Sequence, residues 1–379
     1  MESGGHFGKT HVIRAQYFVY FFILGVFLPY FNLYCYHLDF SGFQIGLLSS
    51  VRSVTLVLFA MMWGSLADHW RIRRPIYIGC AVVSTAIWAF YFCSSRFVPM
   101  LAVTFFYGIF FSPLISFLEA VTMAHLGEKK RQYGRIRAWG SLSFIATVVI
   151  VGRLIDRTSL DVILIVIFGG SIVLSLSAIG LPEAAAREKI SLFSSQTRFL
   201  LSRRVLVFLI CAVLMLVSHG AYYGFFSIHL ERLGFSGTFI GFAWALASMA
   251  EILVMIKSED IFKRFALENV LLFSFLAAVV RWGLLSFVTS AAAILLTQVL
   301  HALTYGTFHM ASILYMDQLA PEESKTLGQA VNNALTYGLG LMIGCFLSGV
   351  LYENHGGFIL FLCSSVLAAV AYFIFRVFR

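Results

Sequence analysis

Apolar runs of membrane-spanning length recur along the whole chain, and they restrict the folds that the chain can adopt. A helix needs about 20 mostly apolar residues to cross the hydrocarbon core of a bilayer. Twelve runs reach or approach that length. No β-barrel alternation appears, so the spans are predicted to be α-helices. The predicted spans are Val12–Tyr36, Gln44–Leu66, Pro75–Cys93, Val98–Met123, Ala138–Leu154, Asp161–Leu181, Val205–Leu230, Phe239–Ile256, Val270–Val288, Ala291–Tyr315, Leu327–Leu351 and Phe358–Phe375.

Composition excludes a soluble fold. Hydrophobic residues make up 60% of the chain and charged residues 12%, against about 25% charged residues in soluble domains. The net charge of +9 comes from short basic clusters between apolar runs, which is typical of membrane topology and not of nucleic-acid binding. We therefore predict an all-α, multi-pass protein of the cell (inner) membrane with no nucleic-acid partner.

The distribution of lysine and arginine predicts the orientation. If the N-terminus is cytoplasmic, the loops on that side hold nearly all of the basic residues. Only Arg96, Arg153, Arg157 and Arg232 fall on the opposite side. This bias places both termini in the cytoplasm. A wrong number of spans would scramble the alternation, so the bias also favours twelve.

Several kinds of chemistry are disfavoured by what the sequence lacks. The six cysteines lie singly, without CxxC pairs or metal-ligand spacing, so we expect no metal site. No HExxH, GxSxG or GxxxxGK[ST] motif occurs, which argues against an integral-membrane enzyme. No cofactor is expected, and no cleaved signal peptide.

The chain resembles itself at an offset near 195 residues. Phe40–Gly46 and Phe235–Gly241 share the order Phe-Ser-Gly before a predicted span, and Gly152–Asp156 and Gly349–Glu353 both run from glycine to an acid. Several such matches in order predict two six-helix bundles, 1–181 and 205–379, joined by a polar linker, 182–204.

The loop after the second span carries a glycine, an acid and a basic cluster. Its key residues are Gly64, Asp68, Arg71, Arg73 and Arg74. The spacing resembles the signature of the major facilitator superfamily. That resemblance implies twelve helices in two bundles and a cytoplasmic gate made by these residues. Alternatively, the three arginines only enforce the orientation of the helix.

Ionisable residues inside the predicted spans are costly unless they are paired or wet. They indicate either a polar cavity or structural ion pairs between helices, and for the histidines a simple interhelical hydrogen bond. The candidates are Arg52, Glu119, Glu251, Arg281, His301 and His309, with Arg137 at the start of the fifth span.

Some of these residues resemble the oligosaccharide:proton symporters, the lactose permease family. Glu119 lies 18 residues before Arg137, the spacing of that family's substrate-binding pair. Phe144 stands where the family has a tryptophan that stacks on the sugar. Thr304 replaces the family's proton-carrying glutamate. This departure argues against a galactoside as the substrate.

Three further positions extend this resemblance. Glu251, Arg281 and His301 are similar to the family's charged residues on helices 8, 9 and 10. Gln298 replaces a helix 10 lysine of that family.

A closer resemblance is to the phenylpropionate permease family. The motifs Phe27–Tyr30, Phe111–Leu114, Tyr133–Gly140 and Val280–Gly283 fit it, as does His309 eight residues after His301. The match covers nearly the whole chain. It implies a proton-coupled symporter that moves an aromatic or other organic acid by alternating access. The alternatives are a sugar or nucleoside symporter and a non-transporting channel or sensor of the same fold.

These resemblances imply roles for individual residues. The small-molecule substrate is expected to meet Glu119, Arg137, Phe144, Arg52, Arg281, Tyr305 and Asn332, with Trp139 and Phe308 as further apolar wall. Proton coupling is expected at Glu251 first, then at Glu119, His309 or His301, because a carboxyl shielded from water holds its proton more easily. The proton gradient would supply the energy, and the protein is expected to work as a monomer in the lipid bilayer.

Overall fold

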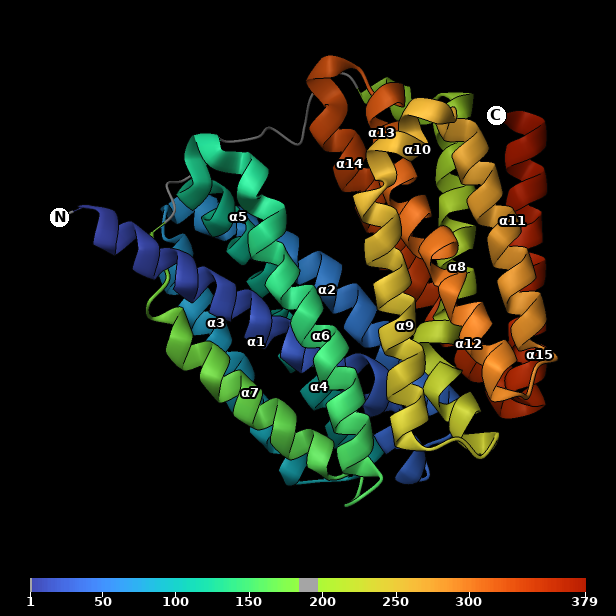
Figure 1. Cartoon of the computed structure of the whole chain (residues 1–379), viewed down its shortest axis with the longest axis horizontal. Coiled ribbons are helices and arrows are strands. Elements are labelled where there is room, and N and C mark those ends of the chain that lie inside the picture. The colour runs from blue at the N-terminus through green and yellow to red at the C-terminus, as the bar shows by residue number, and fades with distance from the viewer. Residues whose placement is uncertain (1, 184–196) are drawn as a thin grey trace. The chain divides into compact units, whose positions relative to one another are not determined.

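The computed structural model describes residues 2–183 and 197–379, and no strand lies within these ranges (Figure 1). Most of the predicted linker, residues 184–196, lies outside the described residues. Side chains are described except for residues 2–7, Asp68, Lys130 and Arg131. The prediction of an all-α protein is confirmed for the part of the chain that is described.

The helices follow one another with short connections. The helices before the gap are α1 (Glu2–His37), α2 (Gly42–Trp70), α3 (Arg73–Trp88), α4 (Phe97–Phe111), α5 (Pro113–Leu126), α6 (Tyr133–Ile155) and α7 (Val162–Ala178), with 3-10 turns η1 (Ala89–Phe92) and η2 (Gly127–Gln132). After the gap come η3 (Thr197–Leu201), α8 (Arg203–Arg232), α9 (Gly237–Ile256), α10 (Ser258–Arg264), α11 (Leu267–Leu285), α12 (Ala291–Val299), η4 (Ala302–Thr307), α13 (Phe308–Leu319), η5 (Glu322–Ser324), α14 (Lys325–Asn333), η6 (Ala334–Gly340) and α15 (Leu341–Phe378).

Ten helices of the described residues are long and apolar enough to cross a membrane. Two places account for the difference from the predicted twelve. Val162–Ala178 has 17 residues and is shorter than the others. The last two predicted spans are joined into one helical stretch, Glu322–Phe378. That stretch bends at Gly356, whose φ of 76° suits glycine alone.

The chain forms two compact units. Unit 1 comprises residues 1–38, 54–189 and 236–241, and unit 2 comprises residues 39–53, 190–235 and 242–379. The start of α2 therefore belongs to unit 2 and the start of α9 to unit 1. The division into bundles 1–181 and 205–379 stays a prediction.

Unit 1 is built around α1, which packs between α6 and α7 (Figure 1). The core is rich in aromatic rings. Trp88 is fully buried and donates its indole N–H to the Leu164 carbonyl at 3.0 Å. Gln16 of α1 donates to the Leu174 carbonyl of α7 at 3.0 Å. Trp88 and Gln16 thus place their hydrogen bonds between helices, as polar groups in membrane helix pairs commonly do.

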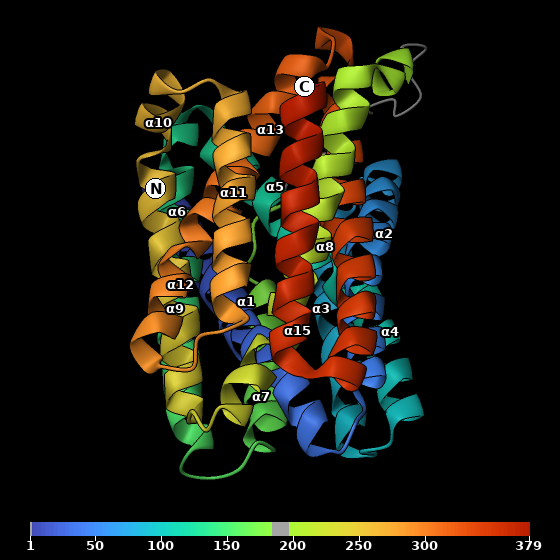
Figure 2. The same cartoon turned by 90° about the vertical axis from the view of Figure 1, so that its right-hand side faces the viewer.

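Unit 2 is built around α8, which lies along α15 (Figure 2). The two helices approach so closely that a Cβ on Gly220 would stand 2.1 Å from the backbone carbon of Gly344. Glycine on both helices permits this contact, as in membrane helix pairs generally. Trp282 of α11 is also buried in this core, and its indole N–H donates a hydrogen bond to Ser218 Oγ at 3.2 Å.

The glycine-to-acid repeat has a structural explanation, because each acid caps the start of another helix. In unit 1, Asp156 accepts the backbone N–H groups of Gly237 at 2.6 Å and Thr238 at 2.9 Å. In unit 2, Glu353 accepts the N–H of Phe43 at 2.7 Å. Helix N-termini offer unpaired N–H groups and a partial positive charge, so a carboxylate fits there.

Two π-helical turns interrupt the later helices. They are η4 and η6, and both carry the sequence Ala-Leu-Thr-Tyr-Gly, at Ala302–Gly306 and Ala334–Gly338. π-helical turns are rare and frequently lie at functional sites. Sequence reasoning did not identify this second repeat.

Candidate functional site

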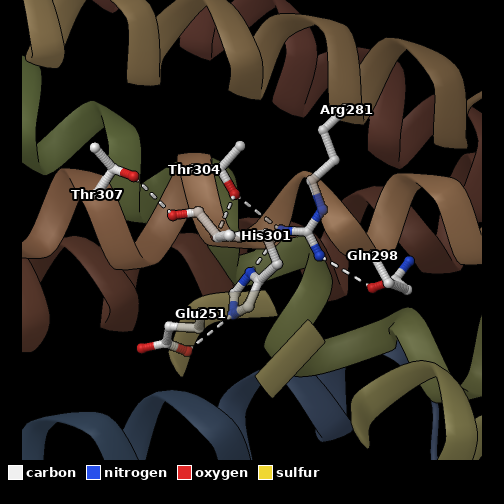
Figure 3. A network of polar contacts seen from close by, with 7 residues as sticks. Glu251, Arg281, Gln298, His301, Thr304 and Thr307 are labelled. Carbon is white, nitrogen blue, oxygen red and sulfur yellow. Dashed lines mark hydrogen bonds and ion pairs between the residues drawn. The ribbon is translucent and has the colours of Figure 1, made fainter. Parts of the chain in front are cut away.

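Arg281 of α11 is the centre of a polar network in unit 2 (Figure 3). Its side chain is 0% exposed. Nη1 donates to His301 Nδ1 at 2.8 Å and to Thr304 Oγ1 at 3.1 Å. Nη2 donates to Gln298 Oε1 at 3.1 Å. All three acceptors are neutral side chains from the α12–η4 segment, so this segment holds the buried cation.

Aromatic rings complete the surroundings of the guanidinium. Its central carbon lies 4.5 Å from the ring centroids of both Tyr222 and Trp282, within cation–π range. In the part of the chain that the structure describes, no carboxylate forms an ion pair with Arg281. Rings and neutral acceptors therefore replace the acid that usually accompanies a buried arginine.

Glu251 of α9 lies at the edge of this network. Its Oε2 is 3.8 Å from His301 Nε2, and its side chain is 21% exposed. Gly306 gives it room, because a Cβ there would stand 2.9 Å from Glu251 Cγ. An arginine can only donate, so the Nδ1 atom of His301 must accept. The proton of neutral His301 is thereby placed on Nε2, the nitrogen that faces Glu251.

A row of parallel rings leads away from His301. Tyr305 stacks on His301 at a centroid distance of 5.3 Å and on His309 at 6.1 Å. His309 Nδ1 shares a hydrogen bond of 2.5 Å with the hydroxyl of Tyr337. Tyr337 comes from η6 and was not predicted as a site residue. The repeated Ala-Leu-Thr-Tyr-Gly sequence was the signal that would have found it, because it pairs Tyr337 with Tyr305.

Asn332 lies close to this row but is engaged with its own neighbours. It is 0% exposed, donates to Ser312 at 3.1 Å and accepts from Thr336 at 3.1 Å. These contacts fit the alternative of a plain interhelical hydrogen bond. Phe308, proposed as part of an apolar wall, is fully buried next to Phe275.

A second charged cluster lies in unit 1 and includes Glu119 and Arg137. The Arg137 guanidinium lies over the Phe21 ring at 4.0 Å and 5.7 Å from the Tyr17 centroid. Tyr133 donates a long hydrogen bond of 3.4 Å to Glu119. Glu119 and Arg137 attract each other electrostatically. Among the described residues, however, they form no ion pair within 4.0 Å.

Two further residues were predicted to meet the substrate, Phe144 and Arg52. Phe144 is buried on α6, and Arg52 is on the α2 segment that belongs to unit 2, where it interacts electrostatically with Cys345. No group of His, Cys, Asp or Glu side chains suited to a metal ion occurs within the described ranges.

The predicted gate residues lie at the α2–α3 junction. Arg71 has a φ of 57°, and Arg73 is 9% exposed. Arg74 donates to the Ile179 carbonyl at 2.5 Å. No heavy atom of the described residues lies within 4 Å of a Cβ built on Gly64. The side chain of Asp68 lies outside the described residues, so the gate stays a prediction.

The described residues form a multi-pass helical membrane protein with charged clusters inside its helices. The family model described as "MFS_1 like family" matches residues 11–363. The chain therefore belongs to the MFS_1 like family. It is a multi-pass membrane transporter and not an enzyme.

Curated relatives cover nearly the whole chain. The chain is 29% identical over 361 residues to the "Probable 3-phenylpropionic acid transporter" of Escherichia coli (strain K12), covering 92% of this chain and 93% of that protein. It is 24% identical over 355 residues to the maltose permease of Geobacillus stearothermophilus, covering 92% and 89%. The predicted resemblance to the phenylpropionate permease family is confirmed.

Solved structures show the same fold. The crystal structure of nucleoside transporter NupG matches with a TM-score of 0.87 at 17% identity, covering 97% of this chain and 98% of that one. A bacterial homolog of the human lysosomal transporter Spinster, in an inward-facing and unoccupied conformation, matches with a TM-score of 0.77 at 13% identity, covering 99% and 98%. At these identities the likeness concerns the fold alone.

Proposed function

We propose that this protein is a proton-coupled symporter that moves an aromatic or other organic acid by alternating access. It would work as a monomer in the inner membrane, with twelve helices, both termini in the cytoplasm and the proton gradient as its energy source. The observation that carries the proposal is the arrangement of Glu251, His301 and Arg281, which holds an acid against a histidine of fixed tautomer.

In this arrangement Glu251 is the proton carrier. A proton on His301 Nδ1 would put an N–H group against the donating Nη1 of Arg281, 2.8 Å away. The imidazole therefore keeps its N–H on Nε2, 3.8 Å from Glu251 Oε2, and the transported proton binds the Glu251 carboxyl. Protonation removes the negative charge that faces His301 and weakens the contact between α9 and η4. This change is the coupling step of the proposal.

The carboxylate of the substrate is assigned to Arg137. The guanidinium lies on aromatic rings and makes no hydrogen bond to another described side chain, so its donors are open to a bidentate carboxylate. Phe21 and Tyr17 offer ring surface beside it. The similarity to the probable 3-phenylpropionic acid transporter of Escherichia coli supports an aromatic acid.

A sugar or nucleoside is the second candidate, and Glu119 favours it. A carboxylate near Arg137 repels an acid but accepts hydrogen bonds from hydroxyl groups. A thermal-shift screen of the purified protein with 3-phenylpropionate, disaccharides and nucleosides separates the two. Stabilisation by a sugar or nucleoside but by no acid would make a sugar or nucleoside the first candidate substrate and an organic acid the second.

The coupling step is tested with Glu251→Gln in proteoliposomes. We expect the variant to lose accumulation of 3-phenylpropionate driven by a pH gradient while it keeps substrate exchange without a gradient. Glu259→Gln is the matched control, since Glu259 is exposed and, among the described residues, pairs with Lys263 alone. Gradient-driven accumulation by Glu251→Gln at the wild-type level would refute the role of Glu251. Wild-type flux that does not depend on the pH gradient would favour a channel.

A further inference from the structure

A groove lies between α1 and α6 in unit 1, and it includes Trp139, which the sequence had suggested as apolar wall of the substrate site. It has a volume of about 260 Å³ and is lined by His11, Arg14, Ala15, Phe18 and Val19 of α1 and by Trp139 of α6. Residues 11, 14, 15 and 18 follow the i, i+3, i+4, i+7 spacing of one helix face. Four of the six lining residues thus lie on one face of α1.

The groove and the Arg137 cluster use different sides of α6. Trp139 follows Arg137 by two positions, which on an α-helix turns the side chain by about 200°. Arg137 contacts the rings of Phe21 and Tyr17, and neither ring lines the groove. A ligand in the groove would therefore not occupy the proposed substrate position.

The residues that line the groove change from basic to apolar along α1. Its two basic residues, His11 and Arg14, lie toward the N-terminal end of α1, and Phe18 and Val19 lie further along. Phe18 is 37% exposed and Trp139 is 43% exposed. From His11 to Phe18 the helix rises by about 10 Å. A ligand with an anionic head and an apolar tail matches this order.

Arg14 also has an unused donor. Its Nε atom is buried and has no hydrogen-bond partner among the described residues. A buried donor without a partner is costly, and an anionic oxygen is the acceptor that a guanidinium binds best. Trp139 adds an indole, the ring typical of the membrane–water interface.

We propose that this groove is a binding site for an anionic phospholipid. Arg14 and His11 bind the phosphate, and Phe18, Val19 and the Trp139 ring contact the first part of an acyl chain. Basic pockets between membrane helices bind anionic headgroups in this way. The site requires only that α1 lies in the membrane, so it does not depend on the identity of the transported solute.

Native mass spectrometry of the purified full chain tests the proposal. Phosphatidylglycerol and phosphatidylcholine with identical acyl chains are added in turn. We expect wild type to retain phosphatidylglycerol preferentially, and Arg14→Gln to reduce its affinity about fivefold, the effect of one basic residue near an anionic surface. Lys9→Gln is the matched control, because Lys9 is exposed on α1 outside the groove and its loss should leave the affinity unchanged.

A second measurement uses Trp139 and does not depend on Arg14→Gln folding. Brominated phosphatidylglycerol should quench part of the tryptophan fluorescence of wild type, and Trp139→Phe should lose that part. Equal phosphatidylglycerol binding by Arg14→Gln and wild type, equal retention of both lipids, or unchanged quenching in Trp139→Phe would each overturn the proposal. Full displacement of the lipid by soluble glycerol phosphate would overturn it too, since it would show a site for free phosphates.

Discussion

The two charged clusters differ in how they accommodate an arginine among membrane helices. In unit 2, Arg281 is 0% exposed, and its two terminal nitrogens, Nη1 and Nη2, donate to neutral side chains, while its buried Nε has no hydrogen-bond partner among the described residues. In unit 1, Arg137 lies on aromatic rings, and within the described residues it makes no hydrogen bond. A buried charge needs either compensating dipoles or a ligand that arrives later. The cluster around Arg281 suits proton coupling at a fixed geometry. The cluster around Arg137 suits binding of a substrate carboxylate.

The largest effect is expected for Arg281→Gln. The change leaves His301 and Gln298 without their donor, and each buried polar group left unpaired costs about 1–3 kcal/mol. Uptake should fall by about 100-fold or more, an effect of about 2.7 kcal/mol, and the thermal midpoint should drop clearly. The checks are initial uptake rates and thermal unfolding in detergent. A variant as stable as wild type would show that Arg281 is not the structural centre of its cluster.

Arg137→Gln should separate binding from stability. Charge-assisted hydrogen bonds contribute about 1.5–3 kcal/mol each, so the apparent KM for 3-phenylpropionate should rise about 10- to 100-fold. Because Arg137 has no hydrogen bonds to lose to other described residues, the thermal midpoint should change little. A large loss of stability with an unchanged KM would reverse the contrast between the clusters.

One tyrosine forms a hydrogen bond in each cluster, and removing each hydroxyl should affect uptake less than the arginine changes do. Tyr337 bonds His309 at 2.5 Å, and Tyr133 bonds Glu119 at 3.4 Å. Tyr337→Phe should slow proton-driven uptake by about two- to tenfold, the range of one neutral hydrogen bond, and should change its pH profile. Tyr133→Phe should stay within twofold of wild type. Equal effects of the two changes on uptake and on its pH profile would contradict the assignment of a tighter network to unit 2.

A helix cap outside both clusters gives the smallest expected effect. Burial raises the pKa of Asp156, but hydrogen bonds from Thr238 and Gly237 lower it more, so the folded pKa lies below its ordinary value. A lowered pKa stabilises the protein above the unfolded value of about 3.9 and loses this contribution as pH falls through the folded value. Asp156→Asn should therefore cost about 1 kcal/mol at pH 7, and the difference from wild type should vanish in acid.

Denaturation at pH 7 and below pH 4 measures this dependence. Glu353→Gln is the partner variant, since Glu353 makes one described backbone contact where Asp156 makes two. Its effect at pH 7 should be smaller. A difference between Asp156→Asn and wild type that persists unchanged in acid would rule out the carboxylate as its source.

Sequence predicted the helical membrane fold because apolar runs of this length have few other structures open to them. The helix count was less secure, since Gly356 bends one continuous stretch and Val162–Ala178 is short. The close packing of Gly220 on Gly344 was not predicted. It depends on which helices meet, which local patterns do not encode.

The charged residues of the candidate site were named from the sequence, but their hydrogen-bond partners were not. Resemblance indicated Glu251, Arg281 and His301 one by one, and the structure brings them into one network. Thr304 and Gln298 were noticed only as departures from the lactose permease family, yet both accept hydrogen bonds from Arg281. Neutral residues at these positions explain why the cation is held without an acid. Tyr337 was missed because its partner His309 lies 28 residues away on another helix.

The capping of α2 by Glu353 has a consequence for how the chain is made. Phe43 and its acceptor are separated by 310 residues, whereas Asp156 and Gly237 are 81 apart. At synthesis rates of about 5–20 residues per second, the first cap must wait about 15–60 s and the second only about 4–16 s. The first turn of α2 thus enters the membrane long before its partner exists. Biogenesis of this protein ends, in effect, by completing one of its earliest helices.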